Sequence, residues 1–271
     1  MNVKGKLMMS MSIAEAINLL GNFCGKRELP ELSQKGLKQK YGFSQADVYV
    51  LFGGSILAGG DVLAEAIREK VAKTYLIVGG EGHTTESLRI RMHEEYPDFM
   101  TDGLSEAQVF AGFLQRKYDY KVDYLECEST NCGNNITNLL ELLQEKKISF
   151  KSIILSQDAT MQYRMAATLR KYVSEDIAII NYATYQAKAI LDGNRLMFEK
   201  EIWGMWNMDR YITLLMGEIP RLTDDANGYG PRGSNFIAHV DIPDDVKEAF
   251  ALLQDKYKDN VRVANPLYAS K

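Results

Sequence analysis

The nine residues Asp47–Ser55, DVYVLFGGS, combine an uninterrupted apolar run with a glycine-rich end. Such a run is typical of a parallel β-strand that helices cover on both faces, and the glycines permit a tight turn after it. The same arrangement recurs at 74–83, TYLIVGGEGH. Two units of this kind predict an α/β protein with a parallel sheet.

The alternation of strand and helix continues along the chain. We expect three further strands, at 122–126, 152–158 and 177–183, and intervening helices at 61–73, 104–118, 136–147 and 160–172. Five strands that alternate with helices predict a Rossmann-like, doubly wound, mainly parallel five-stranded sheet. Because right-handed crossovers bring the carboxyl ends of such strands to one edge, we expect the ligand to bind there.

Helical segments flank this domain on both sides. The predicted parts are an N-terminal helical arm at 1–45, the Rossmann-like domain at 46–185 and a mainly helical C-terminal extension at 186–271. Ser12 followed by Glu15 is a capping-box signature for the first helix. Further helical structure is expected near 30–41, 195–216 and 244–257.

The extension also contains a long irregular segment, 217–236, that is rich in arginine and aromatic residues. An irregular segment of this length inside a compact protein is usually functional or disordered, and its composition argues against plain disorder. We interpret it as a lid-like loop or a wall over the site.

Composition argues against several classes of partner and of metal site. The chain has 271 residues, 46% hydrophobic and 25% charged, and its net charge of −4 favours neither a nucleic-acid nor a membrane-surface partner. Three cysteines without metal-site spacing predict neither a disulfide framework nor a zinc site, and no calcium motif is present. No apolar run is long enough to span a bilayer, so we expect a cytoplasmic protein without a metal.

The turns after the first two strands are the first candidate binding elements. Gly53, Gly54 and Ser55 follow one strand, and Gly79 and Gly80 follow the next. Glycines at these points let backbone N–H groups approach a phosphate or carboxylate, although tight turns alone would also explain them. Three residues further on, His83 has the chemistry for acid–base catalysis.

Two carboxylates are expected at the same edge. Glu106 opens a helix, where it either complements the helix dipole or acts with His83 as an acid–base group. Glu126 ends a buried strand and needs a partner there. The partner is a ligand hydroxyl or amine, or else the polar side chains of its own loop, which are Ser129, Thr130, Asn131 and Asn135.

The loop after the fourth strand contributes Asp158 and Thr160, followed by Arg164 in the next helix. Asp158 is a candidate N-cap of that helix. Arg164 is a candidate clamp for a carboxylate or phosphate, or else the partner of Asp158 in an internal salt bridge. In the tail, Arg232 is a further candidate ligand contact.

These motifs, in this order, resemble the ElyC/SanA/YdcF family of bacterial α/β proteins, and its YdcF branch most closely. The resemblance covers nearly the whole chain and rests on the motifs DVYVLFGGS, LIVGGEGH, Ser105-Glu106-Ala107, STNCGNN, QDATMQYR and GEIPRLTDDANGYGPRGSNF. It implies a Rossmann-like domain with S-adenosylmethionine as the ligand. The residues that it implies at the ligand edge are Gly53, Gly54, Gly79, Gly80, Glu106, Glu126, Ser129, Asn131, Asn135 and Arg164.

The chain departs from the wider family at three positions, where Thr160 stands for His, Cys132 for Thr and Asn134 for Glu. Losing the histidine and the glutamate weakens any hydrolytic or transfer mechanism that the wider family implies. The membrane segment of SanA-like and ElyC-like members is also missing, so their envelope location does not transfer.

Three functional hypotheses follow. The first is a cytoplasmic protein that binds a nucleotide-like small molecule, with S-adenosylmethionine as the candidate. The second is a transferase or hydrolase for a phosphorylated or glycan-like substrate. The third is an interaction module whose tail docks a partner through Trp203, Trp206 and Tyr229, unless the two tryptophans are simply part of the core.

Overall fold

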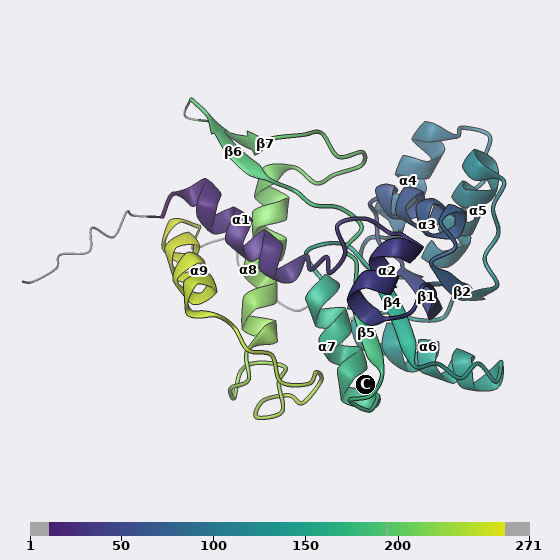
Figure 1. The fold of residues 1–271 in the computed structure, drawn as a ribbon. Coiled ribbons are helices and arrows are strands. Elements are labelled where there is room, and N and C mark those ends of the chain that lie inside the picture. Colours follow the sequence, from purple (N-terminus) through teal and green to yellow (C-terminus); the bar gives the residue numbers. More distant parts are fainter. Residues whose placement is uncertain (1–10, 194, 258–271) are drawn as a thin grey trace, which may run out of the picture.

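The structure is a computed structural model that describes residues 11–193 and 195–257. Its centre is a parallel five-stranded sheet of order β3-β2-β1-β4-β5 (Figure 1). The strands are β1 (Ala46–Phe52), β2 (Ala72–Val78), β3 (Tyr124–Glu126), β4 (Ser152–Ser156) and β5 (Ala178–Asn181). The predicted Rossmann-like α/β fold is confirmed.

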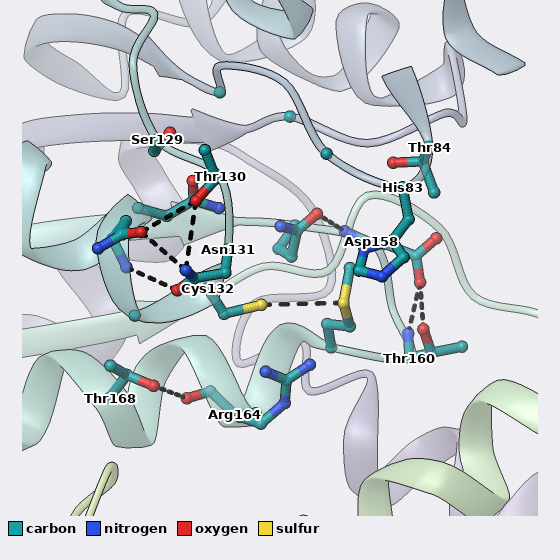
Figure 2. Close-up of a pocket in the computed structure, with 18 of the residues that line it drawn as sticks. His83, Thr84, Ser129, Thr130, Asn131, Cys132, Asp158, Thr160, Arg164 and Thr168 are labelled. Atoms are coloured by element: carbon teal, nitrogen blue, oxygen red, sulfur yellow. Dashed lines mark hydrogen bonds between the residues drawn. The ribbon is translucent and has the colours of Figure 1, made fainter. Parts of the chain in front are cut away.

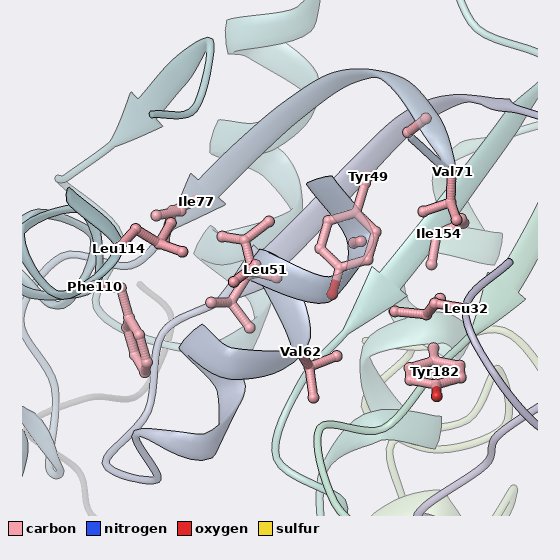
Figure 3. Packing of buried hydrophobic residues seen from close by; sticks show 14 of the residues in the cluster. Leu32, Tyr49, Leu51, Val62, Val71, Ile77, Phe110, Leu114, Ile154 and Tyr182 are labelled. Carbon is pink, nitrogen blue, oxygen red and sulfur yellow. The ribbon is translucent and has the colours of Figure 1, made fainter. Parts of the chain in front are cut away.

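Helices cover both faces of this sheet. The helices α3 (Ala58–Arg68), α4 (Thr85–Glu95) and α5 (Glu106–Tyr118) lie on one face, and α6 (Cys132–Glu145) and α7 (Gln162–Tyr172) lie on the other. Side chains of β1 alternate between the two layers. Tyr49 and Leu51 belong to the core cluster that contains Phe110 (Figure 3), whereas Val48 and Val50 belong to the cluster that contains side chains of α6. Burial on both faces explains why the strand is apolar at successive positions.

The order of the strands determines where a ligand can enter. The chain places β2 and β3 on one side of β1 and then returns to place β4 and β5 on the other. The carboxyl ends of β1 and β4 therefore flank the point at which the winding reverses. A crevice forms at such a point because the adjoining loops diverge to opposite faces of the sheet.

A second core joins the two ends of the chain. The helices α1 (Ile13–Cys24), α8 (Met208–Leu222) and α9 (Asp244–Lys256) pack together beside the hairpin of β6 (Ala189–Asp192) and β7 (Arg195–Phe198) (Figure 1). Ser12 caps α1, with the predicted capping box to Glu15. A short helix, α2 (Gln34–Tyr41), leads into β1.

The helical structure predicted from residue 195 was wrong. Residues 195–198 form β7, and the helix begins only at Met208 behind the N-cap Asn207. In this strand Leu196 and Phe198 are half-buried, while the residues between and before them are exposed. This period of two suits a hairpin with one face on the core.

The predicted helix 61–73 also extended too far. The α3 helix ends at Arg68, and Lys70 adopts a positive φ of 51° that ends the helical path. Ala72 then pairs with Ala46 at the start of β2. Within 11–193 and 195–257, no helix is both long and apolar enough to cross a bilayer.

Candidate functional site

A cavity of about 510 Å³ lies at the carboxyl edge of the sheet (Figure 2). The loops after β1, β2, β3 and β4 line one part of it, and α7, α8 and the segment 229–237 line the rest. The size suits a small-molecule ligand. Twelve of the predicted site residues line it, namely Gly53, Gly79, Gly80, His83, Glu106, Ser129, Thr130, Asn131, Asn135, Asp158, Thr160 and Arg164.

Four other predicted residues do not line the cavity, namely Gly54, Ser55, Glu126 and Arg232. Ser55 is buried outside it. The Arg232 side chain is exposed, and its Nε lies 3.4 Å from Oδ2 of Asp224. The structure therefore does not place these four residues on the cavity wall.

With Asp158, Glu106 is one of two acidic side chains on the described lining of the cavity. It is buried, and its Oε1 accepts hydrogen bonds from the hydroxyls of Thr84 (3.0 Å) and Thr85 (2.9 Å). The structure gives Oε2 no hydrogen-bond partner among the described residues. Burial raises the pKa of this carboxyl, and the two threonine hydroxyls oppose the shift. The free oxygen can therefore bind a hydroxyl or ammonium group of a ligand.

The glycines after β1 and β2 make room for this carboxyl. A Cβ atom on Gly53 would lie 2.3 Å from Oε2 of Glu106, and one on Gly80 would lie 2.4 Å from the carbonyl oxygen of Ser129. Their N–H groups are already used, since Gly53 donates to Val78 (2.7 Å) and Gly80 to Ser129 (3.1 Å). Close packing, rather than hydrogen bonding to a ligand, explains these glycines.

Glu126 stabilises its own loop. Its Oε1 accepts hydrogen bonds from the backbone N–H groups of Glu128 (2.7 Å) and Ser129 (3.0 Å) and from the side-chain amide of Asn138 (3.0 Å). The second oxygen is buried without a partner among the described residues. The sequence left open whether Glu126 binds a ligand group or the polar groups of its own loop. The structure shows bonds to the loop.

The amino end of α6 reaches the cavity next to this loop. Asn131 is the N-cap, and its side-chain oxygen accepts a hydrogen bond from the N–H of Asn134 at 3.0 Å. Cys132 and Gly133 in the first turn line the cavity, and the Cys132 sulfur lies 4.0 Å from that of Met161 (Figure 2). The positive end of the α6 dipole therefore favours an anionic ligand group here.

Asp158 organises the loop after β4 but does not cap the next helix. Its Oδ1 accepts hydrogen bonds from the N–H (2.8 Å) and hydroxyl (2.6 Å) of Thr160 and from Tyr185 (2.9 Å). The N-cap of α7 is Met161, without a side-chain bond. Burial raises the pKa of Asp158, and these hydrogen bonds oppose the shift. The prediction that Asp158 caps α7 was therefore wrong, because its side chain folds back onto its own turn.

Arg164 pairs with a residue that the sequence did not indicate. Its Nε lies 2.5 Å from Oε2 of Glu218 and its Nη2 lies 3.0 Å from Oε1, so the ion pair is bidentate. Burial opposes the charge of the guanidinium, but Cys132 and Glu218 raise its pKa above the usual value. The arginine therefore stays cationic on the cavity wall, and the alternative Asp158–Arg164 salt bridge is not formed.

His83 lies at the exposed margin of the cavity. The segment 217–236, interpreted as a lid or wall, contributes Arg221, Tyr229 and Phe236 to the lining. The prediction that it is irregular throughout was wrong, because α8 continues to Leu222 and carries Arg221. Trp206 also lines the cavity, with its indole N–H 3.4 Å from Oδ2 of Asp158. The other tryptophan, Trp203, packs on Phe113 in the core at a ring distance of 5.6 Å.

Sequence reasoning missed the lining residues on α7 and α8. Thr168 and Tyr172 follow Arg164 at intervals of four residues, which places all three on one face of a helix. That spacing could have identified the α7 face. Arg210 and Leu214 on α8 show no such signal, because only the packing of α8 onto the domain brings them to the cavity.

A search against models of protein families found none that matches this chain.

Proposed function

We propose that this protein binds a nucleotide-like small molecule that carries both an anionic group and hydrogen-bond donors, with S-adenosylmethionine as the candidate. The observation that carries the proposal is the buried carboxyl of Glu106, with Oε2 unpartnered among the described residues, on a small-molecule-sized cavity at the reversal point of the sheet. Ligands of doubly wound folds bind at that point. The choice of S-adenosylmethionine itself follows from the family resemblance of the sequence motifs.

The charges around the cavity fit a ligand of this kind. Glu106 supplies an acceptor for an ammonium group or ribose hydroxyls. Arg164 and the amino end of α6 favour a carboxylate. The indole ring of Trp206, also on the lining, provides a surface for a planar base. S-Adenosylmethionine carries all of these groups.

Calorimetric titration with S-adenosylmethionine tests the proposal. We expect Glu106→Gln to weaken binding about tenfold to hundredfold, since a hydrogen bond to a charged group contributes about 1.5–3 kcal/mol. The matched control is Glu126→Gln, which changes a buried carboxylate at the same edge that does not line the cavity. It should leave the affinity unchanged. Absence of heat with the wild-type protein at millimolar ligand would rule S-adenosylmethionine out.

One observation favours the alternative, a transferase or hydrolase for a phosphorylated or glycan-like substrate. Burial raises the pKa of Glu106, as is common for general acids. The other predicted acid–base residue, His83, is exposed. Release of phosphate or sugar from a model substrate, lost in Glu106→Gln but kept in His83→Gln, would support a catalytic role for Glu106 alone.

A further inference from the structure

The cavity has two parts of different chemistry. We call the part lined by the loops after β1–β4 the inner compartment. Glycines, hydroxyls, amides and the Glu106 carboxyl dominate it. We call the part lined by α7, α8 and the segment 229–237 the outer compartment. Apart from hydroxyl groups, it is lined by aromatic, aliphatic and arginine side chains, namely Arg164, Thr168, Tyr172, Arg210, Leu214, Arg221, Tyr229, Phe236 and Ile237.

The outer compartment extends along α7. Arg164, Thr168 and Tyr172 lie at successive intervals of four residues, so they span about 12 Å of the helix axis at 1.5 Å per residue. Arg164 stands nearest the inner compartment, where its ion pair with Glu218 fixes the guanidinium. Tyr172 marks the far end of this face. A ligand that fills the inner compartment therefore leaves a further length of cavity beside α7.

A tightly folded segment, 229–238, builds another wall of the outer compartment. The N–H groups of Phe236 (2.8 Å) and Ile237 (3.0 Å) both donate to the carbonyl of Tyr229. Ala238 donates to Ala167 on α7 at 2.9 Å, and the Lys171 ammonium donates to the carbonyl of Asn235. These bonds attach the segment to α7 at two points, so the outer compartment is a preformed feature of the fold.

Aromatic side chains stand on both walls of this compartment. Tyr172 and Phe236 are each 48% exposed, although both are large apolar side chains. Phe236 packs edge-on against Tyr229 with ring centroids 5.2 Å apart. Half-exposed aromatic rings on a preformed concave surface favour binding of another ring.

The charges on the lining favour an anion. Three arginines belong to the outer compartment, and the two acidic side chains on the described lining, Glu106 and Asp158, both come from the inner part. Glu218 neutralises Arg164 in part, and the other two arginines of this lining, Arg210 and Arg221, come from α8. Arg221 lies over the Tyr229 ring, 6.0 Å from its centroid. An aromatic ring with a negative substituent would meet both a ring surface and a guanidinium.

We propose that the outer compartment binds a second ligand, an aromatic anion, at the same time as the nucleotide-like ligand occupies the inner compartment. The identity of the inner ligand rests on the proposed function, whereas the outer site is argued from its own lining. Simultaneous binding of two small molecules in one cavity is the arrangement that a two-substrate reaction requires.

Two matched fluorescent probes test this proposal. Anilinonaphthalene sulfonate is an aromatic anion, and N-phenylnaphthylamine has the same ring system without the charge. We expect the anion to bind about tenfold more tightly than the neutral probe. The variants Tyr172→Ser and Phe236→Ser, at half-exposed positions, should each weaken binding of the anion up to about tenfold. The control Leu191→Ser removes a side chain that is 52% exposed on β6, outside the cavity lining, and should leave it unchanged.

Titration of S-adenosylmethionine into the same variants separates the two proposals. We expect Tyr172→Ser and Phe236→Ser to leave its affinity unchanged, and Glu106→Gln to leave the affinity for the sulfonate probe unchanged. Competition between the two ligands, or equal binding of the sulfonate probe to wild-type protein and both aromatic variants, would overturn the outer site. Loss of S-adenosylmethionine binding alone, with the probe pattern intact, would overturn only the proposed function.

Discussion

Arg164 of α7 and Glu218 of α8 form a bidentate ion pair at 2.5 and 3.0 Å, with side-chain exposures of only 11% and 1%. The pair joins the Rossmann-like domain to the second core, because α7 flanks the sheet and α8 packs with α1 and α9. It also holds the guanidinium on the cavity wall. One contact therefore serves both the packing of the extension and the charge of the candidate site.

Removing one partner of this pair should destabilise the protein strongly. Arg164→Met leaves Glu218 as a buried charge without its counterion, which typically costs about 3–5 kcal/mol of unfolding free energy. Chemical denaturation measures this loss. The double variant Arg164→Met/Glu218→Leu removes both charges and should recover most of it. A double variant as unstable as the single one would show that packing, and not charge, dominates at this contact.

The affinity for S-adenosylmethionine should rise with pH through the titration of Glu106. Burial raises the pKa of this carboxyl above its reference of 4.5, and only the ionised form accepts hydrogen bonds with both oxygens. Binding should therefore weaken as the pH falls through the raised pKa. In Glu106→Gln this pH dependence should be absent. An identical pH profile in the two proteins would contradict the assignment.

The contribution of Glu106 to folding stability should fall as the pH rises, whereas the affinity for the ligand should rise. A carboxyl whose pKa is raised by folding binds its proton more tightly in the folded state. Its contribution to stability therefore falls as the pH rises from 4.5 through the raised pKa. We expect Glu106→Gln to gain thermal stability relative to the wild type over that range. Melting curves at several pH values measure the difference, and a gain at the acidic end instead would refute it.

Replacing Glu126 should lower the stability of the protein without changing its affinity for the ligand. Glu126→Ala leaves three N–H donors without their acceptor, and we expect a loss of roughly 2–4 kcal/mol in unfolding free energy. The control Glu128→Ala, at an exposed carboxylate of the same loop, should cost little. Both variants should bind S-adenosylmethionine as tightly as the wild type at temperatures where they are folded.

The wall of the outer compartment should depend on the protonation of His239. Its Nδ1 lies 2.7 Å from Oδ2 of Asp224 and its Nε2 lies 3.0 Å from Oδ1 of Asp241. The Asp224 contact raises the pKa of the histidine above 6.5. Protonated His239 therefore stabilises the folded protein. This stabilisation is complete below pH 6.5 and disappears as the pH rises through the raised pKa. The wild-type protein should therefore melt at a higher temperature than His239→Gln below that pKa, and the difference should become smaller above it.

The ion pair between Asp224 and His239 should also be lost in strong acid, when Asp224 becomes protonated. The N–H of Arg232 and the ring of His239 lower its pKa below 3.8. Its contribution is therefore present above 3.8 and disappears as the pH falls through the lowered value. The stability difference between wild type and His239→Gln should also shrink in strong acid. A difference that does not change with pH would mean that the ion pair has no role in holding the wall.

A glycine in this wall should not tolerate alanine. A Cβ on Gly228 would lie 2.0 Å from the carbonyl oxygen of Thr223, so the backbone must move. We expect Gly228→Ala to cost about 1–3 kcal/mol and to weaken the binding of the sulfonate probe. In the control Gly54→Ala the nearest atom lies at 3.7 Å, an ordinary contact. Equal stability of the two variants would show that the wall can rearrange.

The sequence predicted part of the candidate site because strand ends and their loops are local features. The loops after β1–β4, together with the first turns of α5, α6 and α7, supplied the twelve predicted residues that line the cavity. The α8 residues and Glu218 could not be found in this way, because no local pattern states which distant helix will pack on α7. The hairpin of β6 and β7 was missed for another reason, since an alternation over four residues is a weak signal.

The sequence by itself determined the parallel α/β sheet, because apolar runs that end in glycine require burial on both faces and a turn at one edge. The tertiary structure decided which carboxylate faces the cavity. Glu106 and Glu126 were both expected at that edge, yet Glu106 lines the cavity, whereas Glu126 turns to the backbone of its own loop and does not line it. The direction of a side chain depends on partners that only the folded chain brings into contact.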